Sequence, residues 1–134
     1  LCTLIKPEQQ IGYRLVLPET ANSPSLDPSD PALYASDDPH FVGMQFQRYV
    51  TQIDSFLDDH FDFILIDGRA RTSCLLHSLS KVRVGGSIIL DNSDRPYYTE
   101  RLHPQLSAFL EQRFYGIAPA SLGYTQTTIF TRQR

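Results

Sequence analysis

The clearest periodic pattern in the chain lies between residues 46 and 57. Apolar side chains recur there at intervals of three and four residues, which places them on one face of a helix. The polar residues between them fall on the opposite face. The segment is therefore predicted to be an amphipathic helix, and its apolar positions are Phe46, Tyr49, Val50, Ile53, Phe56 and Leu57.

Two short apolar runs have the character of buried strands. Residues 61–66 read FDFILI and residues 87–90 read SIIL, and the two runs end at Asp67 and Asp91. Continuous apolar strands of this kind are typical of parallel sheets that are covered on both faces. Between them, residues 72–82 carry apolar side chains at helical spacing, so we expect a helix that connects two parallel strands.

The remaining segments give a less regular pattern. Residues 13–17 (YRLVL) suggest a further strand, and residues 20–39, which are rich in Pro, Ser and Asp, suggest an irregular surface loop. Residues 102–110 suggest a third helix with Pro104 in its first turn. The β-like runs 114–117 and 125–131 suggest an antiparallel pair.

Together these elements predict an α/β fold with a mainly parallel sheet, helices on both faces and a C-terminal antiparallel hairpin. The chain is long enough for one domain over residues 1–134. The residues expected to be almost fully buried are Ile53, Ile64, Leu65, Ile66, Ile88, Ile89 and Leu90.

Composition excludes several classes of protein. The apolar content of 41% and charged content of 20% are those of an ordinary globular domain. No apolar run approaches the roughly 20 residues of a membrane-spanning helix, and a net charge of −3 gives no support to nucleic-acid binding. Cys2 and Cys74 lack the spacing of a zinc site, and reduced thiols fit a cytoplasmic location.

Polar residues follow both predicted central strands. Ligands bind beyond the carboxyl ends of the strands in open parallel sheets, and Asp67, Asp91 and Asn92 are expected to converge there. Three such oxygen ligands suit a hard cation such as Mg²⁺. The competing interpretation is that these side chains only cap the turns and helices that follow them.

Arginines are the second candidate group. Arg69, Arg71 and Arg95 fall in the loops after the two strands, where guanidinium forks suit a carboxylate or phosphate. Residues 19–67 hold ten acidic residues and one base, so pairing with this acidic segment is an equal alternative. Tyr97 and Tyr98 are candidates to line an acceptor pocket, although aromatic residues in such loops more often serve packing alone.

At this point a family resemblance emerges. The FDFILIDG strand, the helix after it, the GG turn and the SIILDN strand resemble strands four and five of class I S-adenosylmethionine-dependent methyltransferases. The final pair of β-runs resembles the reversed hairpin of that Rossmann-like fold. The resemblance covers residues 46–134 well and residues 1–38 weakly, as a third strand and its loop. It implies methyl transfer from S-adenosylmethionine to a small-molecule acceptor, with O-methylation favoured.

The resemblance also implies roles for individual residues. Catechol-type members hold a cation with an Asp that ends strand four and an Asp-Asn pair that ends strand five, which Asp67, Asp91 and Asn92 match. It therefore implies catalytic roles for these three residues and a magnesium ion between them. The sequence Gly68-Arg69-Ala70-Arg71 departs from the pattern, because two guanidinium groups beside a cation are unfavourable by charge.

The half of the family's domain that binds the cofactor is not recognisable. None of the seven glycines forms a glycine-rich turn after a strand. We therefore expect a truncated methyltransferase-like domain that is inactive alone, with an exposed sheet edge that favours a homodimer. Alternatives are a non-catalytic Rossmann-like binding or oligomerisation module and a different Rossmann-like enzyme, because fold alone does not fix function.

Overall fold

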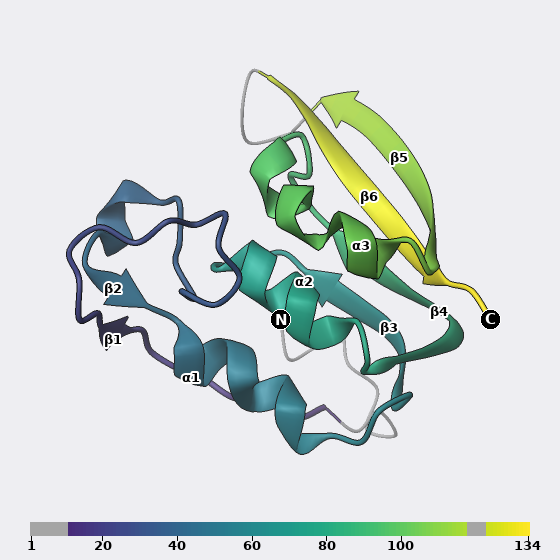
Figure 1. Ribbon diagram of the computed structural model, residues 1–134, viewed down its shortest axis with the longest axis horizontal. Coiled ribbons are helices and arrows are strands. Elements are labelled where there is room, and N and C mark those ends of the chain that lie inside the picture. The colour runs from purple at the N-terminus through teal and green to yellow at the C-terminus, as the bar shows by residue number, and fades with distance from the viewer. Residues whose placement is uncertain (1–10, 118–122) are drawn as a thin grey trace.

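The computed structural model describes residues 11–117 and 123–134. Within them the chain is an α/β structure, in which a four-stranded mixed sheet packs against short helices (Figure 1). A second sheet has two short antiparallel strands, β1 (Glu19–Thr20) and β2 (Met44–Gln45). The expected α/β class is thus confirmed.

The main sheet has the strand order β3-β4-β6-β5. Strands β3 (Phe61–Ile66) and β4 (Val82–Leu90) are parallel, as the two apolar runs predict. Strand β6 (Tyr124–Arg132) is antiparallel both to β4 and to β5 (Phe109–Ile117). The predicted C-terminal hairpin is therefore present, with its second strand inserted between β4 and β5.

The glycine pair at the start of the second apolar run lies inside β4. The register between β3 and β4 shifts at this point, from Phe61 opposite Val82 to Phe63 opposite Ser87. Gly85 has a φ of +78°, and a Cβ on Gly86 would lie 2.7 Å from the backbone oxygen of Asp62. Glycines here let β4 bulge while its backbone stays close to β3.

The helices are shorter than the sequence pattern suggests. The amphipathic segment 46–57 forms one turn of α-helix followed by a 3₁₀-helix. The third predicted helix, residues 102–110, is broken into short helical pieces. The last piece, α3, has a proline in its first turn, as expected. Their bounds are η2 Pro39–Phe41, α1 Gln47–Val50, η3 Thr51–Ser55, α2 Arg71–Ser78, η4 Pro96–Tyr98, η5 Glu100–Leu102 and α3 His103–Leu106.

The core lies between one face of the main sheet and the helices. Ile66, Ile88, Leu90 and Phe130 point from three strands into a cluster with Leu75 of α2. Burial of such side chains contributes about 1.5–3 kcal/mol each. Tyr98, Leu102 and Leu106 of the later helical pieces complete this cluster. The helical layer therefore fixes how the segment after β4 lies on the sheet.

The opposite face of the sheet is uncovered within the described residues. Phe63 and Leu65 of β3 are 71% and 66% exposed, and Leu110 of β5 is 53% exposed. The expectation of helices on both faces, and of a buried Leu65, is therefore wrong for this part of the chain. Ile53, Ile64 and Ile89, which were expected to be almost fully buried, are only half-buried.

Two further predictions on secondary structure are wrong. Residues 13–17 form no strand, because no described strand lies beside them to accept their backbone hydrogen bonds. Phe109 and Leu110 belong to β5 and not to a helix, since they pair with Arg132 and Thr131 of β6. Pairing with a distant strand overrides the local helical spacing there.

Among the described residues, no helix has the length and apolar character that crossing a bilayer requires. The expectation that residues 20–39 are irregular agrees with the structure, in which turns, bends and unassigned backbone make up nearly all of that segment.

A pair of alanine substitutions tests this one-sided core. Ile88→Ala should lower the free energy of unfolding by about 2–5 kcal/mol, because Ile88 is fully buried. Ile89→Ala should cost clearly less, since its side chain faces the uncovered side of the same strand. Urea melts of both variants measure the difference. Equal losses would mean that a covering layer buries Ile89 as well.

Candidate active site

The candidate site lies where β3 and β4 end together. Ile66 is opposite Leu90 in the parallel register, and the backbone N–H of Asp91 donates to the carbonyl of Ile66 at 3.1 Å. The residues that follow, Asp67 and the pair Asp91-Asn92, therefore leave the sheet side by side. This is the arrangement that the two apolar runs predict.

The chain turns sharply after β3 before it enters α2. Ala70 has a φ of +50° and precedes the helix without a capping side chain. This left-handed residue directs the first residue of α2, Arg71, back toward the strand ends. The Arg71 side chain is only 7% exposed, which is rare for a charged group without partners.

Arg71 donates hydrogen bonds to both strand ends. Its Nε donates to the carbonyl of Gly68 at 3.1 Å, and its Nη2 donates to Oδ1 of Asp67 at 3.0 Å. Its Nη1 donates to the carbonyl of Asp91 at 3.0 Å and to Oδ1 of Asn92 at 2.6 Å. Two of the three predicted metal ligands thus meet on one guanidinium group.

The third predicted ligand is held elsewhere. The Asp91 carboxylate accepts a hydrogen bond from Thr127 of β6 at 2.8 Å. Asn92, whose φ is +50°, donates from its amide nitrogen to Thr125 at 2.9 Å. The turn after β4 is therefore tied both to Arg71 and to β6.

This donor set does not fit a divalent cation. A guanidinium group already lies between Asp67 and Asn92, and bringing Mg²⁺ against it would place like charges together. Within residues 11–117 and 123–134, no group of three His, Cys, Asp or Glu side chains is arranged to hold a metal. Arg71 supplies the positive charge that the resemblance assigns to a metal.

Residues 37–40, which belong to the acidic segment 19–67, lie beside this site. Arg69 pairs with Asp38 at 2.7 Å and Arg95 pairs with Asp37 at 2.6 Å. Tyr97 and Tyr98 donate from their hydroxyls to the same oxygen of Asp37, at 2.7 and 3.2 Å. Of the two interpretations of these arginines, pairing with the acidic segment is the one seen for Arg69 and Arg95.

These partners perturb the ionisation of the cluster. Burial alone would raise the pKa of Asp37, but the hydrogen bond from Tyr97 and the charge of Arg95 outweigh it and lower that pKa. The pKa of Tyr97 is raised, first by burial and then by donation to Asp37. Asp37 is thus an ionised acceptor that three side chains hold in place.

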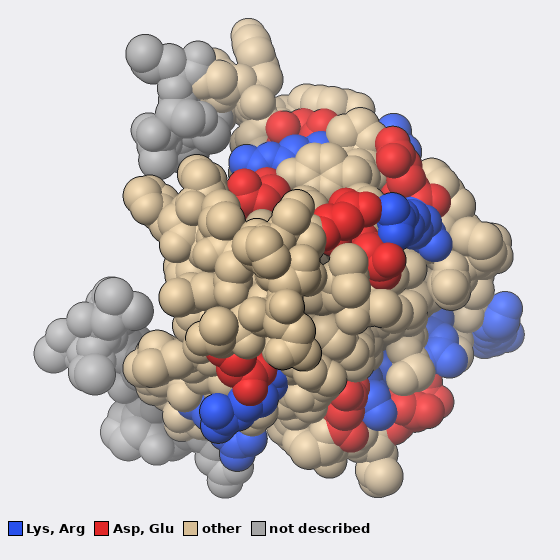
Figure 2. Space-filling view, turned by 60° about the vertical axis from the view of Figure 1, so that its left-hand side comes forward, with Lys and Arg blue, Asp and Glu red and all other residues tan. Residues whose placement is uncertain are grey.

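A polar cavity of about 480 Å³ opens between the acidic segment and the strand ends. On the face in Figure 2, acidic and basic side chains lie beside one another in small groups, without a large patch of one sign. Of the two tyrosines predicted to line a pocket, Tyr98 lines this cavity and Tyr97 does not. The lining residues are Asp37, Asp38, Pro39, His40, Gly68, Arg69, Arg71, Asn92, Arg95 and Tyr98.

Five of these lining residues are not among the candidates from the sequence: Asp37, Asp38, Pro39, His40 and Gly68. The first three lie in the segment that the sequence predicts to be an irregular loop, and His40 follows it directly. The complementary excess of acids before residue 67 and of bases after it was the available signal. Charge balance alone does not say which acid meets which arginine.

Cys74 has no role as a nucleophile in this arrangement. It lies within α2, and burial raises the pKa of its thiol to about 12. A thiol with so high a pKa supplies almost no thiolate at neutral pH.

A scan of protein-family models and a search of curated proteins found no match to the chain.

Replacing Arg71 tests its role between the strand ends. Arg71→Ala should lower the free energy of unfolding by about 2–4 kcal/mol, because four hydrogen bonds from a charged group are lost. Arg71→Lys should recover little of this loss, since an ammonium group cannot reproduce the planar fork. Thermal and urea melts measure both changes.

The control variant is Arg69→Ala, which removes an exposed ion pair and should cost at most about 1 kcal/mol. Millimolar guanidinium, below denaturing concentration, should raise the melting temperature of Arg71→Ala but not of Arg69→Ala. A wild-type melting temperature that rises with Mg²⁺ and falls with a chelator would contradict the assignment of the charge to Arg71.

Asp37 should make stability depend on pH. Its folded pKa lies below the unfolded value of about 3.9, so its contribution is present above that value and is lost as the pH falls through the folded pKa. Asp37→Asn should therefore be destabilised relative to wild type at pH 7, with a gap that narrows below pH ~4. Urea melts across this range give the gap, and a gap independent of pH would contradict this account.

Proposed function

We propose that this chain forms the acceptor-side half of a Rossmann-like domain that transfers a methyl group from S-adenosylmethionine to a small-molecule acceptor. An oxygen atom is the favoured acceptor. The observation that carries the proposal is the polar cavity at the shared carboxyl ends of β3 and β4. Ligands of Rossmann-like sheets bind at this edge.

The sheet gives a second line of support. A parallel pair is followed by an antiparallel hairpin, and the strand beside β4 is antiparallel to it. This is the order of directions that the resemblance implies for the second half of a class I methyltransferase. The segments that follow the two parallel strands, from Gly68 to Arg71 and from Asn92 to Tyr98, supply six of the ten residues that line the cavity.

The chemistry required of these residues is modest. S-adenosylmethionine supplies an activated methyl group, and the protein's main task is to align the acceptor oxygen with it. Asp67 is our candidate to accept the proton of the acceptor hydroxyl, because its side chain is 56% exposed and it directly precedes Gly68 of the cavity wall. Asp67 does not itself line the cavity. Arg71 holds that carboxylate and Asn92 in position, so no step requires a metal ion.

The cavity also limits the substrate. Arg69 and Arg95 already have carboxylate partners, and Arg71 uses its donors on the strand ends. Positive charge in the wall is thus largely balanced by Asp37, Asp38 and Asp67. A neutral acceptor with several hydroxyl groups fits this wall better than a strongly anionic one.

A non-catalytic binding or oligomerisation module remains the second candidate function. The observation that favours it is the outer edge of β3, along which no other described strand lies and which offers a surface for pairing with another chain.

Two probes test the division of roles in this chain. Catechol, a small neutral diol, should shift the amide resonances of Gly68, Arg69 and Asn92 saturably, and Arg95→Ala should weaken the effect. S-adenosylmethionine should bind weakly or not at all in calorimetry, because no glycine-rich cofactor turn is recognisable in the sequence. The matched control for Arg95→Ala is Arg83→Ala, since Arg83 is also exposed but lies outside the cavity.

Either probe can contradict the proposal. A dissociation constant near micromolar for S-adenosylmethionine, equivalent to about −8 kcal/mol, would mean that the cofactor site lies within these residues. Catechol that perturbs no residue of the cavity would remove the acceptor site from the strand ends.

A further inference from the structure

On one side the main sheet ends in strand β5, which pairs with β6 alone. Among the residues that the structure describes, no strand lies along its outer edge, and Figure 1 shows β5 at the rim of the molecule. Its nine residues pair with β6 without a register shift, and the strand contains neither proline nor lysine. Bulges, prolines and lysines are devices that keep edge strands from pairing with other chains. Strand β5 therefore presents a regular and unprotected edge.

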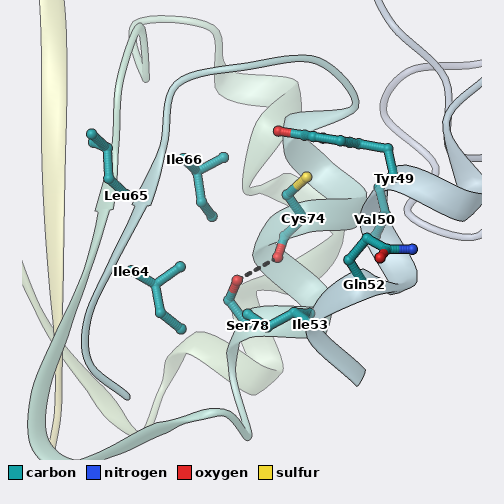
Figure 3. Close-up of a pocket in the computed structure, with 9 residues that line it drawn as sticks. All are labelled: Tyr49, Val50, Gln52, Ile53, Ile64, Leu65, Ile66, Cys74 and Ser78. Carbon is teal, nitrogen blue, oxygen red and sulfur yellow. Dashed lines mark hydrogen bonds between the residues drawn. The ribbon is translucent and has the colours of Figure 1, made fainter. Parts of the chain in front are cut away.

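The two edge strands of the sheet have different surroundings. At β3, residues of the helical segment α1–η3 lie across an apolar cavity from Ile64 and Ile66 (Figure 3). Strand β5 is more open, because eight of its nine residues are exposed. Even the large apolar side chains of Leu110 and Phe114 are each 53% exposed. A further strand can therefore approach β5 without displacing a helix.

The sequence of β5 is chemically symmetric about Gln112. Read from either end toward this residue, the segment 109–115 (FLEQRFY) gives an aromatic, a large apolar, a charged and an amide side chain in the same order. The two charged residues, Glu111 and Arg113, have opposite signs. A strand with this symmetry is complementary to a copy of itself that runs in the opposite direction.

We propose that two copies of this chain form a homodimer in which β5 pairs antiparallel with β5 of the second copy. The twofold axis passes through Gln112 and is perpendicular to the sheet. Glu111 then lies directly opposite Arg113 of the second copy, and the same pair forms again by symmetry. Side chains in this position have Cβ atoms about 4.5–5.5 Å apart, and opposite charges there stabilise the sheet.

Charge also selects this register over its neighbours. Moving the axis to Glu111 would set the two copies of that carboxylate opposite each other, and moving it to Arg113 would do the same with the two guanidinium groups. Like charges directly opposite each other are destabilising. The axis at Gln112 avoids both clashes and also sets Leu110 opposite Phe114 of the second copy on the uncovered face of the sheet.

A cavity at the start of β5 gives independent support. It has a volume of about 190 Å³, and Phe109 and Glu111 line it from the strand while His103 and Leu106 line it from α3. In the proposed pairing, Tyr115 of the second copy lies opposite Phe109 on this same face. Tyr115 is 70% exposed in the single chain. A cavity of about 150 Å³ holds a benzene ring, so this one has room for the tyrosine ring.

The dimer leaves the strand-end cavity of each copy open. None of the ten residues that line that cavity belongs to β5, and β6 separates β5 from β4. The inference therefore does not depend on the proposed function. An interface made of one strand pair falls in the class below about 1,200 Å², which is typical of weak complexes. We accordingly expect a dissociation constant in the micromolar range.

Sedimentation and light scattering over a dilution series test the dimer. Hydrogen exchange at the β5 amides should slow as the concentration rises, while exchange at β3 stays unchanged. Glu111→Arg and Arg113→Glu should each weaken self-association at least about tenfold, because each places like charges opposite one another. Both changes replace exposed side chains, so each variant should fold as wild type, which circular dichroism checks.

Mixing the two variants makes the test specific to this register. One variant carries two bases on β5 and the other carries two acids, so a one-to-one mixture has opposite charges at both positions. It should dimerise as strongly as the wild type, and so should the double variant E111R/R113E. The control is Arg83→Glu, which should leave the affinity unaltered. Arg83 belongs to a similarly exposed ion pair, 52% against 53% for Arg113, but lies on β4.

Four outcomes would overturn the proposal. The first is a wild-type chain that stays monomeric at millimolar concentration, and the second is a dimer whose protected amides lie on β3 and not on β5. The third is a dimer that survives both single charge reversals. The last is a mixture of the two variants that associates no more strongly than either variant alone.

Discussion

The strand-end region depends on the hydrogen bonds that the buried guanidinium group of Arg71 donates. Two parallel strands bring the carboxylate of Asp67, the carbonyl of Asp91 and the amide oxygen of Asn92 to one place. These three oxygen atoms all carry negative or partly negative charge, so they repel one another unless a hydrogen-bond donor lies between them. A planar fork satisfies several acceptors at once, which neither a lysine nor water can do with the same geometry.

The outer part of the site is organised by weaker contacts of the same kind. Exposed ion pairs contribute little individually, but Asp37 also accepts hydrogen bonds from two tyrosine hydroxyls that pack at the core. These bonds fix the acidic segment at a stretch of chain more than fifty residues later. The cavity therefore has a rigid floor at Arg71 and a wall whose position depends on the ionisation of Asp37.

The limits of sequence reasoning are clearest at β3. The FDFILI run predicts a strand that is buried on both faces, because continuous apolar runs are typical of strands with such cover. The predicted bounds of this strand, residues 61–66, are correct. The pattern does not say which chain segment supplies that cover, and Phe63 and Leu65 lack it within the described residues. At the site, the sequence predicts a convergence of polar groups. It does not predict that Arg71 occupies its centre, since that depends on the left-handed conformation of Ala70.

The exposed face and the strand-end site are consequences of one topology. Apolar side chains at consecutive positions of β3 point to both faces of the sheet, so all of them are buried only when both faces are covered. Large exposed apolar surfaces usually mark an interface. Parallel strands are also rarely stable at an edge with one face open to water. The requirement for an added layer thus follows from β3 itself, independently of any family resemblance.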